Sequence, residues 1–352
     1  PFWVNAPAGR CSHTSWCLRR SPSQRRGQMK CRRGDLVSVA VPLICACFGV
    51  ACLKFLGSYQ QDKTLGLVCA VMIGICVAIG IGGALALQAA PDQAGLAAGL
   101  INGVSAGMAA VAVGLFGSKA VECAFLQPRL LAGATLVLAF IMAIALYGLV
   151  VALVTASAAS RTAVDIAPAN VQWFALSEIF ANFGALLGSV ASGWSIMEIG
   201  VEAPSLVMRC MVPMVYHGMI GIYGLLNAVI DTSSVSWPPK GNGAVAGPLY
   251  IVSGLGLAIV GHFGVKRLQQ KPEGYTGMIL GLMMFQTIGF AGLVISLIKH
   301  SSLEQAPKPR GRLEPARDRL GQFMEKNDFE VVALAMVLVL GLLFLLKLRF
   351  LR

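Results

Sequence analysis

Titratable side chains deep inside long apolar runs are the groups of this chain best placed to do chemistry. Glu178 lies about ten residues into one such run, and His217 lies within another. A carboxyl at membrane depth is a functional-site hypothesis by default, because it can hold and release a proton. The structural alternatives are that Glu178 is hydrogen-bonded to Ser177 or Asn182 near an interface, and that His217 is a packed imidazole.

The remaining polar chemistry of the sequence is sparse. Lys119 and Glu122 stand three residues apart near a predicted helix end, which favours a solvated ion pair. Several of the ten cysteines lie in apolar runs and none has zinc-ligand spacing, so neither a disulfide framework nor a metal site is predicted. The sequence contains no P-loop, metalloprotease motif or nucleophile elbow, and no cofactor is expected.

The composition places the chain in a membrane. Of its 352 residues, 56% are hydrophobic and only 12% are charged, whereas an ordinary soluble domain is about 25% charged. The net charge of +12 comes from residues 1–34, 299–330 and the last turn, so residues 35–298 are neutral. A soluble enzyme is thereby excluded, and the basic ends are predicted to meet lipid headgroups or solvent rather than nucleic acid.

Nine apolar stretches are long enough to cross a bilayer as helices, at roughly 20 residues per crossing. They cover residues 35–57, 64–89, 94–118, 130–156, 169–196, 205–230, 244–265, 275–298 and 331–347. These stretches are too long, and alternate too little, to be membrane strands. The predicted fold is therefore all-α, a polytopic membrane protein of about nine transmembrane helices.

Three segments lie outside the main apolar body. Residues 1–34 form a basic segment that we exclude from the fold, either as a targeting segment or as upstream sequence read in frame before a start at Met29. Residues 300–330 carry three prolines among alternating charges and are predicted to be a solvated linker. Residues 331–352 are predicted to hold a C-terminal transmembrane helix.

The predicted spans alternate between two textures. The spans at 94–118, 169–196 and 244–265 are rich in glycine, and the span that follows each of them is bulkier. Because small residues let helix backbones approach closely in lipid, each glycine-rich span is predicted to be the packed inner member of a hairpin. The expected helix-packing positions are Gly107, Gly114, Gly184, Gly188, Gly256 and Gly261.

The bulkier spans share a short signature. Its copies are Leu146-Tyr147-Gly148-Leu149, Ile222-Tyr223-Gly224-Leu225 and Phe290-Ala291-Gly292-Leu293, with a fainter one at residues 78–81. The repeat length of about 65–75 residues corresponds to one hairpin. The sequence therefore predicts two tandem units, residues 35–157 and 165–299, each made of two hairpins.

These residues resemble the proteolipid (c-type) subunits of vacuolar-type proton ATPases. Residues 105–154 resemble the family's second hairpin without a gap, through the glycine-rich stretch 105–117, the loop Gln127, Pro128 and Arg129, and the signature in 146–153. Residues 180–230 resemble the first hairpin, residues 251–298 the second again, and residues 70–86 a first hairpin weakly. The resemblance covers about three quarters of the chain and implies a V0-type membrane subunit built from repeated proteolipid hairpins.

In that family, proton transport rests on a glutamate of the outer helix, five residues before the signature tyrosine. The carboxyl holds a proton while it faces lipid, and an arginine of the stator favours its charged form. In this chain the corresponding positions are Met142, Gly218 and Gln286, and none of them can carry a proton reversibly. Glu178 is the only obvious substitute carboxyl.

The resemblance and the lost carboxylates together predict a structural, proteolipid-like subunit with no catalytic site of its own. The implied partners are the lipid bilayer, the proteolipid ring and the stator a-type subunit, with no nucleic acid. One alternative is a stand-alone transporter or channel built from duplicated hairpins, with a site near Glu178 at the repeat interface. Another is an active rotor subunit that uses Glu178.

Location and orientation follow from the same resemblance. It implies an endomembrane of a vacuole, a lysosome-like body or another acidic organelle, and it leaves a mitochondrial membrane open. It also puts the loop at Gln127, Pro128 and Arg129 in the cytosol, and residues 1–34 and 299–330 on the luminal side. The positive-inside rule favours the reverse orientation, but its bias nearly vanishes if residues 1–28 are not translated.

Overall fold

The computed structural model describes residues 33–56, 63–87, 92–162, 168–233, 243–271 and 273–305. These residues are almost entirely helical and contain no strand. The helices are α1 (Arg33–Leu56), α2 (Lys63–Leu87), α3 (Asp92–Leu126), α4 (Leu131–Thr162), α5 (Pro168–Glu202), the short α6 (Val207–Cys210), α7 (Val212–Ser233), α8 (Gly243–Gln270) and α9 (Gly274–Gln305).

The all-α membrane fold is confirmed. Within the described residues, eight segments are long and apolar enough to cross a membrane, and they correspond to the first eight predicted spans. The predicted ninth span at 331–347, most of the linker at 300–330, and residues 1–32 of the basic segment lie outside the described part of the chain. The described helices all belong to one compact unit.

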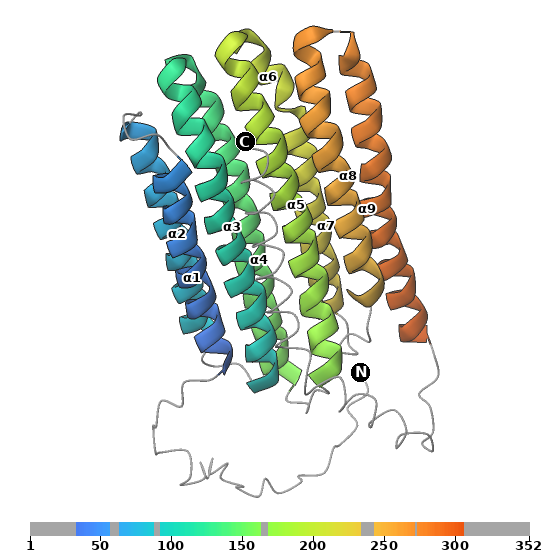
Figure 1. Ribbon diagram of the computed structural model, residues 1–352. Coiled ribbons are helices and arrows are strands. Elements are labelled where there is room, and N and C mark those ends of the chain that lie inside the picture. The colour runs from blue at the N-terminus through green and yellow to red at the C-terminus, as the bar shows by residue number, and fades with distance from the viewer. Residues whose placement is uncertain are drawn as a thin grey trace, which may run out of the picture. The chain divides into compact units, whose positions relative to one another are not determined.

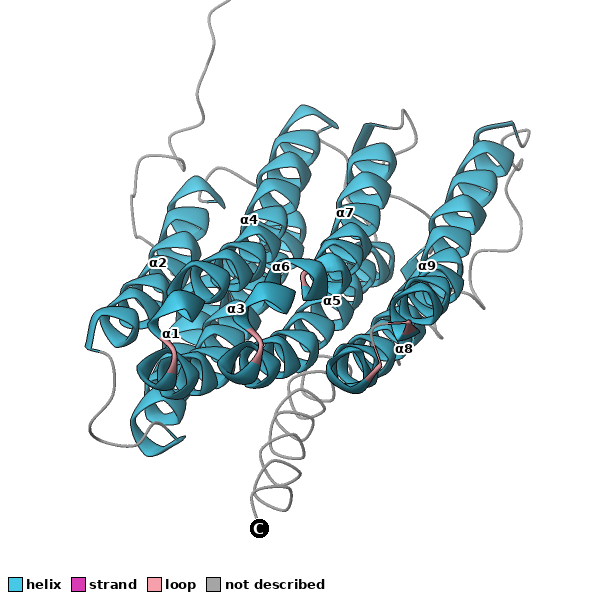
Figure 2. Ribbon diagram, turned by 90° about the horizontal axis from the view of Figure 1, so that it is seen from above, coloured by secondary structure: helices cyan, strands magenta, loops and turns pink. Residues whose placement is uncertain are grey.

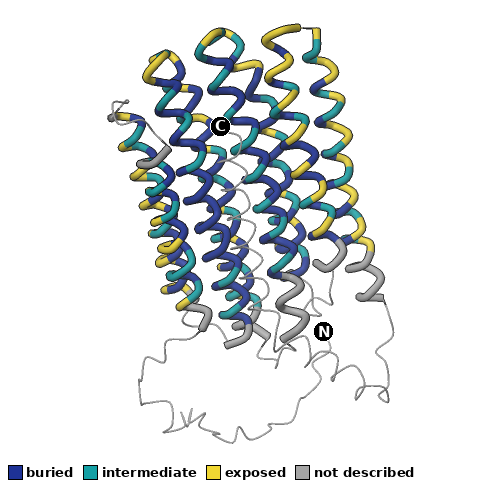
Figure 3. Tube along the Cα trace, in the orientation of Figure 1, coloured by how far each residue is buried: buried dark blue, intermediate teal, exposed yellow. Residues whose placement is uncertain are grey.

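The helices form two rows, which are seen along their length in Figure 1 and from one end in Figure 2. The first row contains α1, α3, α5 and α8, and the second contains α2, α4, α7 and α9. The three glycine-rich helices all lie in the first row. Burial is greatest in the two central helices of the first row, with 89% of the α3 span and 67% of the α5 span buried, and least in α1 at the end of that row, with 28% (Figure 3).

Backbones approach most closely where two glycines meet across the first row. Gly114 of α3 lies against Gly49 of α1, and Gly184 of α5 lies against Gly254 of α8. A Cβ atom at Gly114 or Gly254 would overlap the partner's backbone, so these contacts exist only because both side chains are absent. The other packing positions meet side chains: Gly107 faces Cys45, Gly188 faces His217, Gly256 faces Phe285 and Gly261 faces Ser192.

The first-row helices run further than their apolar stretches predicted. The predicted ends were residues 118, 196 and 265, whereas α3, α5 and α8 end at Leu126, Glu202 and Gln270. Hydropathy falls at the first charged residues, but backbone hydrogen bonding continues through them. The helices end only near the loop prolines, because a proline supplies no N–H to continue the backbone hydrogen bonds.

The three hairpin turns have the same hydrogen bonds. The amides of Gln127, Ala203 and Lys271 each donate to the carbonyl four residues earlier, at 2.8–2.9 Å. Three residues further on, Leu130, Leu206 and Gly274 donate back to those residues at 3.0 Å. This shared geometry fixes the register between the hairpins, so positions can be compared by their distance from the loop proline.

Candidate functional site

The three positions predicted to correspond to the family's glutamate lie in the second row, and each faces the preceding helix of that row. Met142 of α4 accepts a hydrogen bond from the Cys76 thiol of α2, with an S–S separation of 3.6 Å. A Cβ at Gly218 of α7 would meet the ring of Phe140 of α4 at 3.8 Å. Gln286 of α9 meets α7 in the same way. The three positions thus share one geometry, and none holds a carboxyl.

Gln286 is held by the signature tyrosine of the neighbouring helix. Its Nε2 donates to the Tyr223 hydroxyl oxygen at 2.9 Å, and only 7% of the residue is exposed. The Tyr223 ring packs edge-on against Phe290, with 5.9 Å between ring centroids. The Oε1 atom of Gln286 has no partner within the described residues. The position therefore supplies a neutral amide that fixes α9 to α7.

Glu178 lies in the first row and is fully buried. Its Oε1 accepts a hydrogen bond from Asn182 Nδ2 at 3.0 Å, and the same nitrogen donates to Ser105 Oγ of α3 at 2.9 Å. A Cβ at Gly224 of α7 would meet both Glu178 and Ala181, so the signature glycine makes room for the carboxyl. The hydrogen bond to Asn182 that the sequence suggested is confirmed, and Ser105 extends it across the boundary between the predicted units.

Glu178 is not level with Met142, Gly218 and Gln286. It packs against Gly224, which follows Gly218 by six residues on α7. Six helical residues span about 9 Å, so the carboxyl lies that much further from the hairpin turns. It also lies in the opposite row from those three positions.

Asn102 is a buried polar residue that the sequence analysis missed. It precedes its loop proline by 26 residues, as Glu178 does, and it too has no exposed surface. Its Nδ2 donates to Ser38 Oγ of α1 at 2.8 Å and to the Ile79 and Gly80 carbonyls of α2 at 3.2 and 3.3 Å. The repeat register was the signal that could have paired Asn102 with Glu178. Asn102 bonds directly to α1 and α2, whereas Glu178 is linked to α3 through Asn182.

His217 belongs to neither polar cluster. Its ring lies directly against Gly188 of α5, at a point where a Cβ atom would overlap it, and the residue is fully buried. The contact supports the packed imidazole rather than a titrating group. Among described residues, no group of three or more His, Cys, Asp or Glu side chains could hold a metal ion.

A line of charges crosses the first row near the hairpin turns. The ion pair between Lys119 and Glu122 is confirmed at 3.2 Å. Lys119 also lies 3.9 Å from Glu198 of α5 and 5.8 Å from the centre of the Trp194 ring, and Glu198 pairs with Lys266 of α8 at 3.1 Å. These pairs link α3, α5 and α8 at the edge of the apolar region.

Removing the hydroxyl that joins the two predicted units should weaken the fold modestly. We expect Ser105→Ala to cost about 0.6–1.7 kcal/mol, the range for a side-chain hydrogen bond between membrane helices. The measurement is the thermal midpoint of the solubilised chain. Ser118→Ala is the matched control, because that buried hydroxyl donates to the Leu115 carbonyl of its own helix, α3. Equal midpoints for the two variants would contradict a role for Ser105 at this junction.

Parts of the chain are similar in sequence to known membrane proteins. The family model for the C subunit of ATP synthase matches residues 96–155, which contain most of the α3–α4 hairpin. The V-type proton ATPase 16 kDa proteolipid subunit of Chrysotila carterae is 35% identical, over 41% of this chain and 98% of that protein. The c subunit of the V-type proton ATPase of Candida tropicalis is 32% identical, over 40% of this chain and 96% of its own length. The corresponding 16 kDa proteolipid of Homo sapiens is 34% identical over 34% and 83%, respectively.

The fold and these matches define an integral membrane protein made of packed helical hairpins. The chain belongs to the V-type proton ATPase proteolipid family. Each of these relatives spans less than half of it, in keeping with a divergent, duplicated proteolipid.

Proposed function

We propose that the chain is a structural subunit of the membrane sector of a vacuolar-type proton ATPase, which packs among proteolipids without carrying protons. The observation that carries this proposal is the set of residues Met142, Gly218 and Gln286 at the positions of the proton-carrying glutamate. Proton transport requires a group that gains and loses a proton, and a thioether, a glycine and an amide do not titrate. Residues at these positions bind neighbouring helices instead.

The surroundings of Glu178 support a structural role for this carboxyl as well. It is fully buried in the first row and bonded to Asn182, which reaches Ser105. A proton carrier must exchange its proton with a path to water, and this side chain is enclosed by α3, α5 and α7. We therefore assign Glu178 to the junction between the two units rather than to proton exchange.

We infer the partners of the chain in the membrane from the family to which it belongs. The proposed partners are other proteolipids of the ring and the stator a-type subunit, in the membrane of an acidic organelle. The test is affinity purification of the tagged full-length chain in mild detergent, followed by mass spectrometry. We expect stator and soluble-sector ATPase subunits in the eluate. A stand-alone oligomer without them would contradict the proposal and favour a transporter or channel.

Carbodiimide labelling separates a structural subunit from a rotor subunit that uses Glu178. Carbodiimides modify carboxylic acids that they can reach within the membrane. In the native complex we expect no label on the membrane helices of this chain, and a label on Glu178 only after unfolding in strong detergent. Glu178→Gln is the matched control that removes the reactive group. Native labelling of Glu178 accompanied by loss of proton uptake would establish the active alternative.

A further inference from the structure

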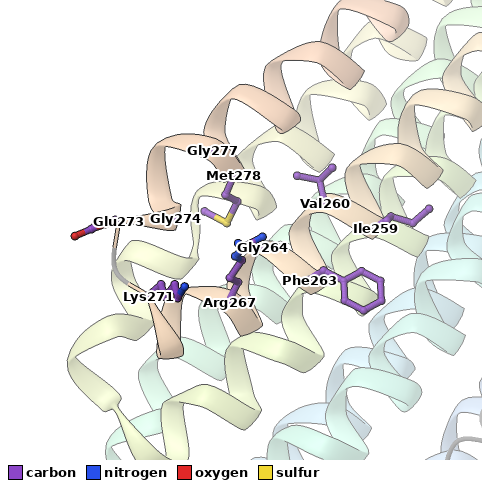
Figure 4. A pocket seen from close by; sticks show the side chains of 10 residues that line it. All are labelled: Ile259, Val260, Phe263, Gly264, Arg267, Lys271, Glu273, Gly274, Gly277 and Met278. Carbon is purple, nitrogen blue, oxygen red and sulfur yellow. The ribbon is translucent and has the colours of Figure 1, made fainter.

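A groove lies between α8 and α9 at the end nearest their turn (Figure 4). Its volume is about 680 Å³, and its walls combine two kinds of residue. Ile259 and Phe263 of α8 form an apolar, exposed wall, and Arg267 and Lys271 provide two cations closer to the turn. Gly277 of α9 leaves open space where a side chain would lie.

The two cations have no ion-pair partner within the described residues. Their neighbour Lys266 pairs with Glu198 at 3.1 Å, but Arg267 and Lys271 are exposed and outside that pair. Glu273, the acidic residue of the groove, carries its carboxylate away from both cations (Figure 4). The groove therefore presents positive charge that nothing in the described chain neutralises.

The repeat register shows that this charge is particular to the last hairpin. Arg267 precedes its loop proline by five residues, and the residues at that register in the earlier hairpins are Cys123 and Ile199. Both are 2% exposed, whereas Arg267 is exposed. Covering an arginine with an uncharged helix is costly unless an anion pairs with it. This edge of the first row is thus suited to an anionic occupant.

The groove lies at the depth of lipid headgroups. The α8 span ends at Gln270 and the α9 span begins at Gly274, so Arg267 and Lys271 lie at the boundary of the apolar region. Ile259 and Phe263 precede Arg267 by two turns and one turn, which places them deeper along the same side of α8. Basic pockets between membrane helices, with apolar surface beneath, suit anionic lipids.

We propose that this groove binds an anionic phospholipid, with its phosphate against Arg267 and Lys271 and one acyl chain along Ile259 and Phe263. The site goes beyond the proposed function and does not depend on whether the chain carries protons. Recognition of charge near a membrane surface contributes roughly a fivefold change in affinity per cation, from about 1 kcal/mol each.

The test is native mass spectrometry of the full-length chain in detergent, titrated with phosphatidylserine or with phosphatidylcholine of the same acyl chains. We expect the chain to retain phosphatidylserine about 25-fold more strongly, from a fivefold contribution by each cation. The double variant Arg267→Gln, Lys271→Gln should lose that preference, and Arg267→Lys should keep most of it. Arg209→Gln is the matched control, because Arg209 is an exposed cation near another hairpin turn.

Soluble glycerophosphoserine separates a lipid site from a simple phosphate site. We expect it to compete poorly, because it lacks the chain that Phe263 would contact. Equal retention of the two lipids by the parent chain, or unchanged preference in the double variant, would overturn the proposal. So would full competition by the soluble headgroup, or a dimer that forms through this groove and excludes lipid.

Discussion

Gly114→Leu is expected to prevent normal packing of the first row, with a loss of at least about 3 kcal/mol in stability. Overpacking by a few methylenes already costs 1–3 kcal/mol where side chains can adjust. At Gly114 the obstacle is the backbone of Gly49 on α1, which cannot move aside without displacing the whole helix. The measurement is the yield and thermal midpoint of monodisperse protein after detergent extraction.

Gly74→Leu is the matched control for this prediction. Gly74 lies in the middle of α2, is exposed, and has nothing within 4 Å of the place where a Cβ atom would lie. Gly74→Leu therefore introduces the same side chain at a similar depth, but at a place where it meets no neighbouring helix. If both variants behave like the parent, close backbone approach at Gly114 does not support the fold.

The sequence was sufficient to predict the first eight spans and the close packing of the three glycine-rich helices. Apolar stretches of about 20 residues define membrane helices because unpaired backbone groups are too costly in lipid. Glycine marks helices that must approach closely, and α3, α5 and α8 lie together in the first row. The sequence did not predict the last helical turns of α3, α5 and α8. These turns contain charged residues, so hydropathy falls there although the backbone hydrogen bonds of the helix continue.

The side-chain contacts were harder to predict. A helix that is apolar on every side gives no periodic signal for which face meets protein, so the partners of Met142 and Gln286 could not be read from their spans. The bond between Glu178 and Asn182 is local, four residues apart, and could be suggested from sequence. The hydrogen bond from Asn182 to Ser105 joins residues that are 77 positions apart, so it could be found only from the three-dimensional structure.

Gln286→Glu is expected to create a carboxyl that reacts with carbodiimide at the position predicted to correspond to the family's glutamate. The new side chain has nearly the same size as the amide, so it should fit against Tyr223. That hydroxyl, now 2.9 Å from Nε2, can instead donate to the carboxyl. A charged carboxylate is costly among Leu282, Phe290 and lipid, which favours the neutral, reactive acid.

Glutamate introduced at the other two positions, 142 and 218, should be accommodated to different degrees by the surrounding side chains. Met142→Glu replaces a flexible side chain that contacts Cys76, and we expect it to be tolerated. Gly218→Glu must place a side chain beside Phe140, at a residue that now has none and is buried. Its yield should be lower than that of the other two variants.

The measurement is labelling at residue 286 and proton uptake by vesicles that carry the complex, with the parent compared under the same conditions. Thr287→Glu is the matched control, because Thr287 is the next residue on α9 and is exposed. Its labelling would show that the reagent reaches this depth. New labelling at residue 286 would then mean that the position opens to lipid, and added proton uptake would mean that the side chain alone separates this position from a proton carrier. If Gln286→Glu assembles normally, and only the Thr287 variant is labelled at every pH, the α7–α9 contact remains closed. The position would then lie outside the proton path of a rotor.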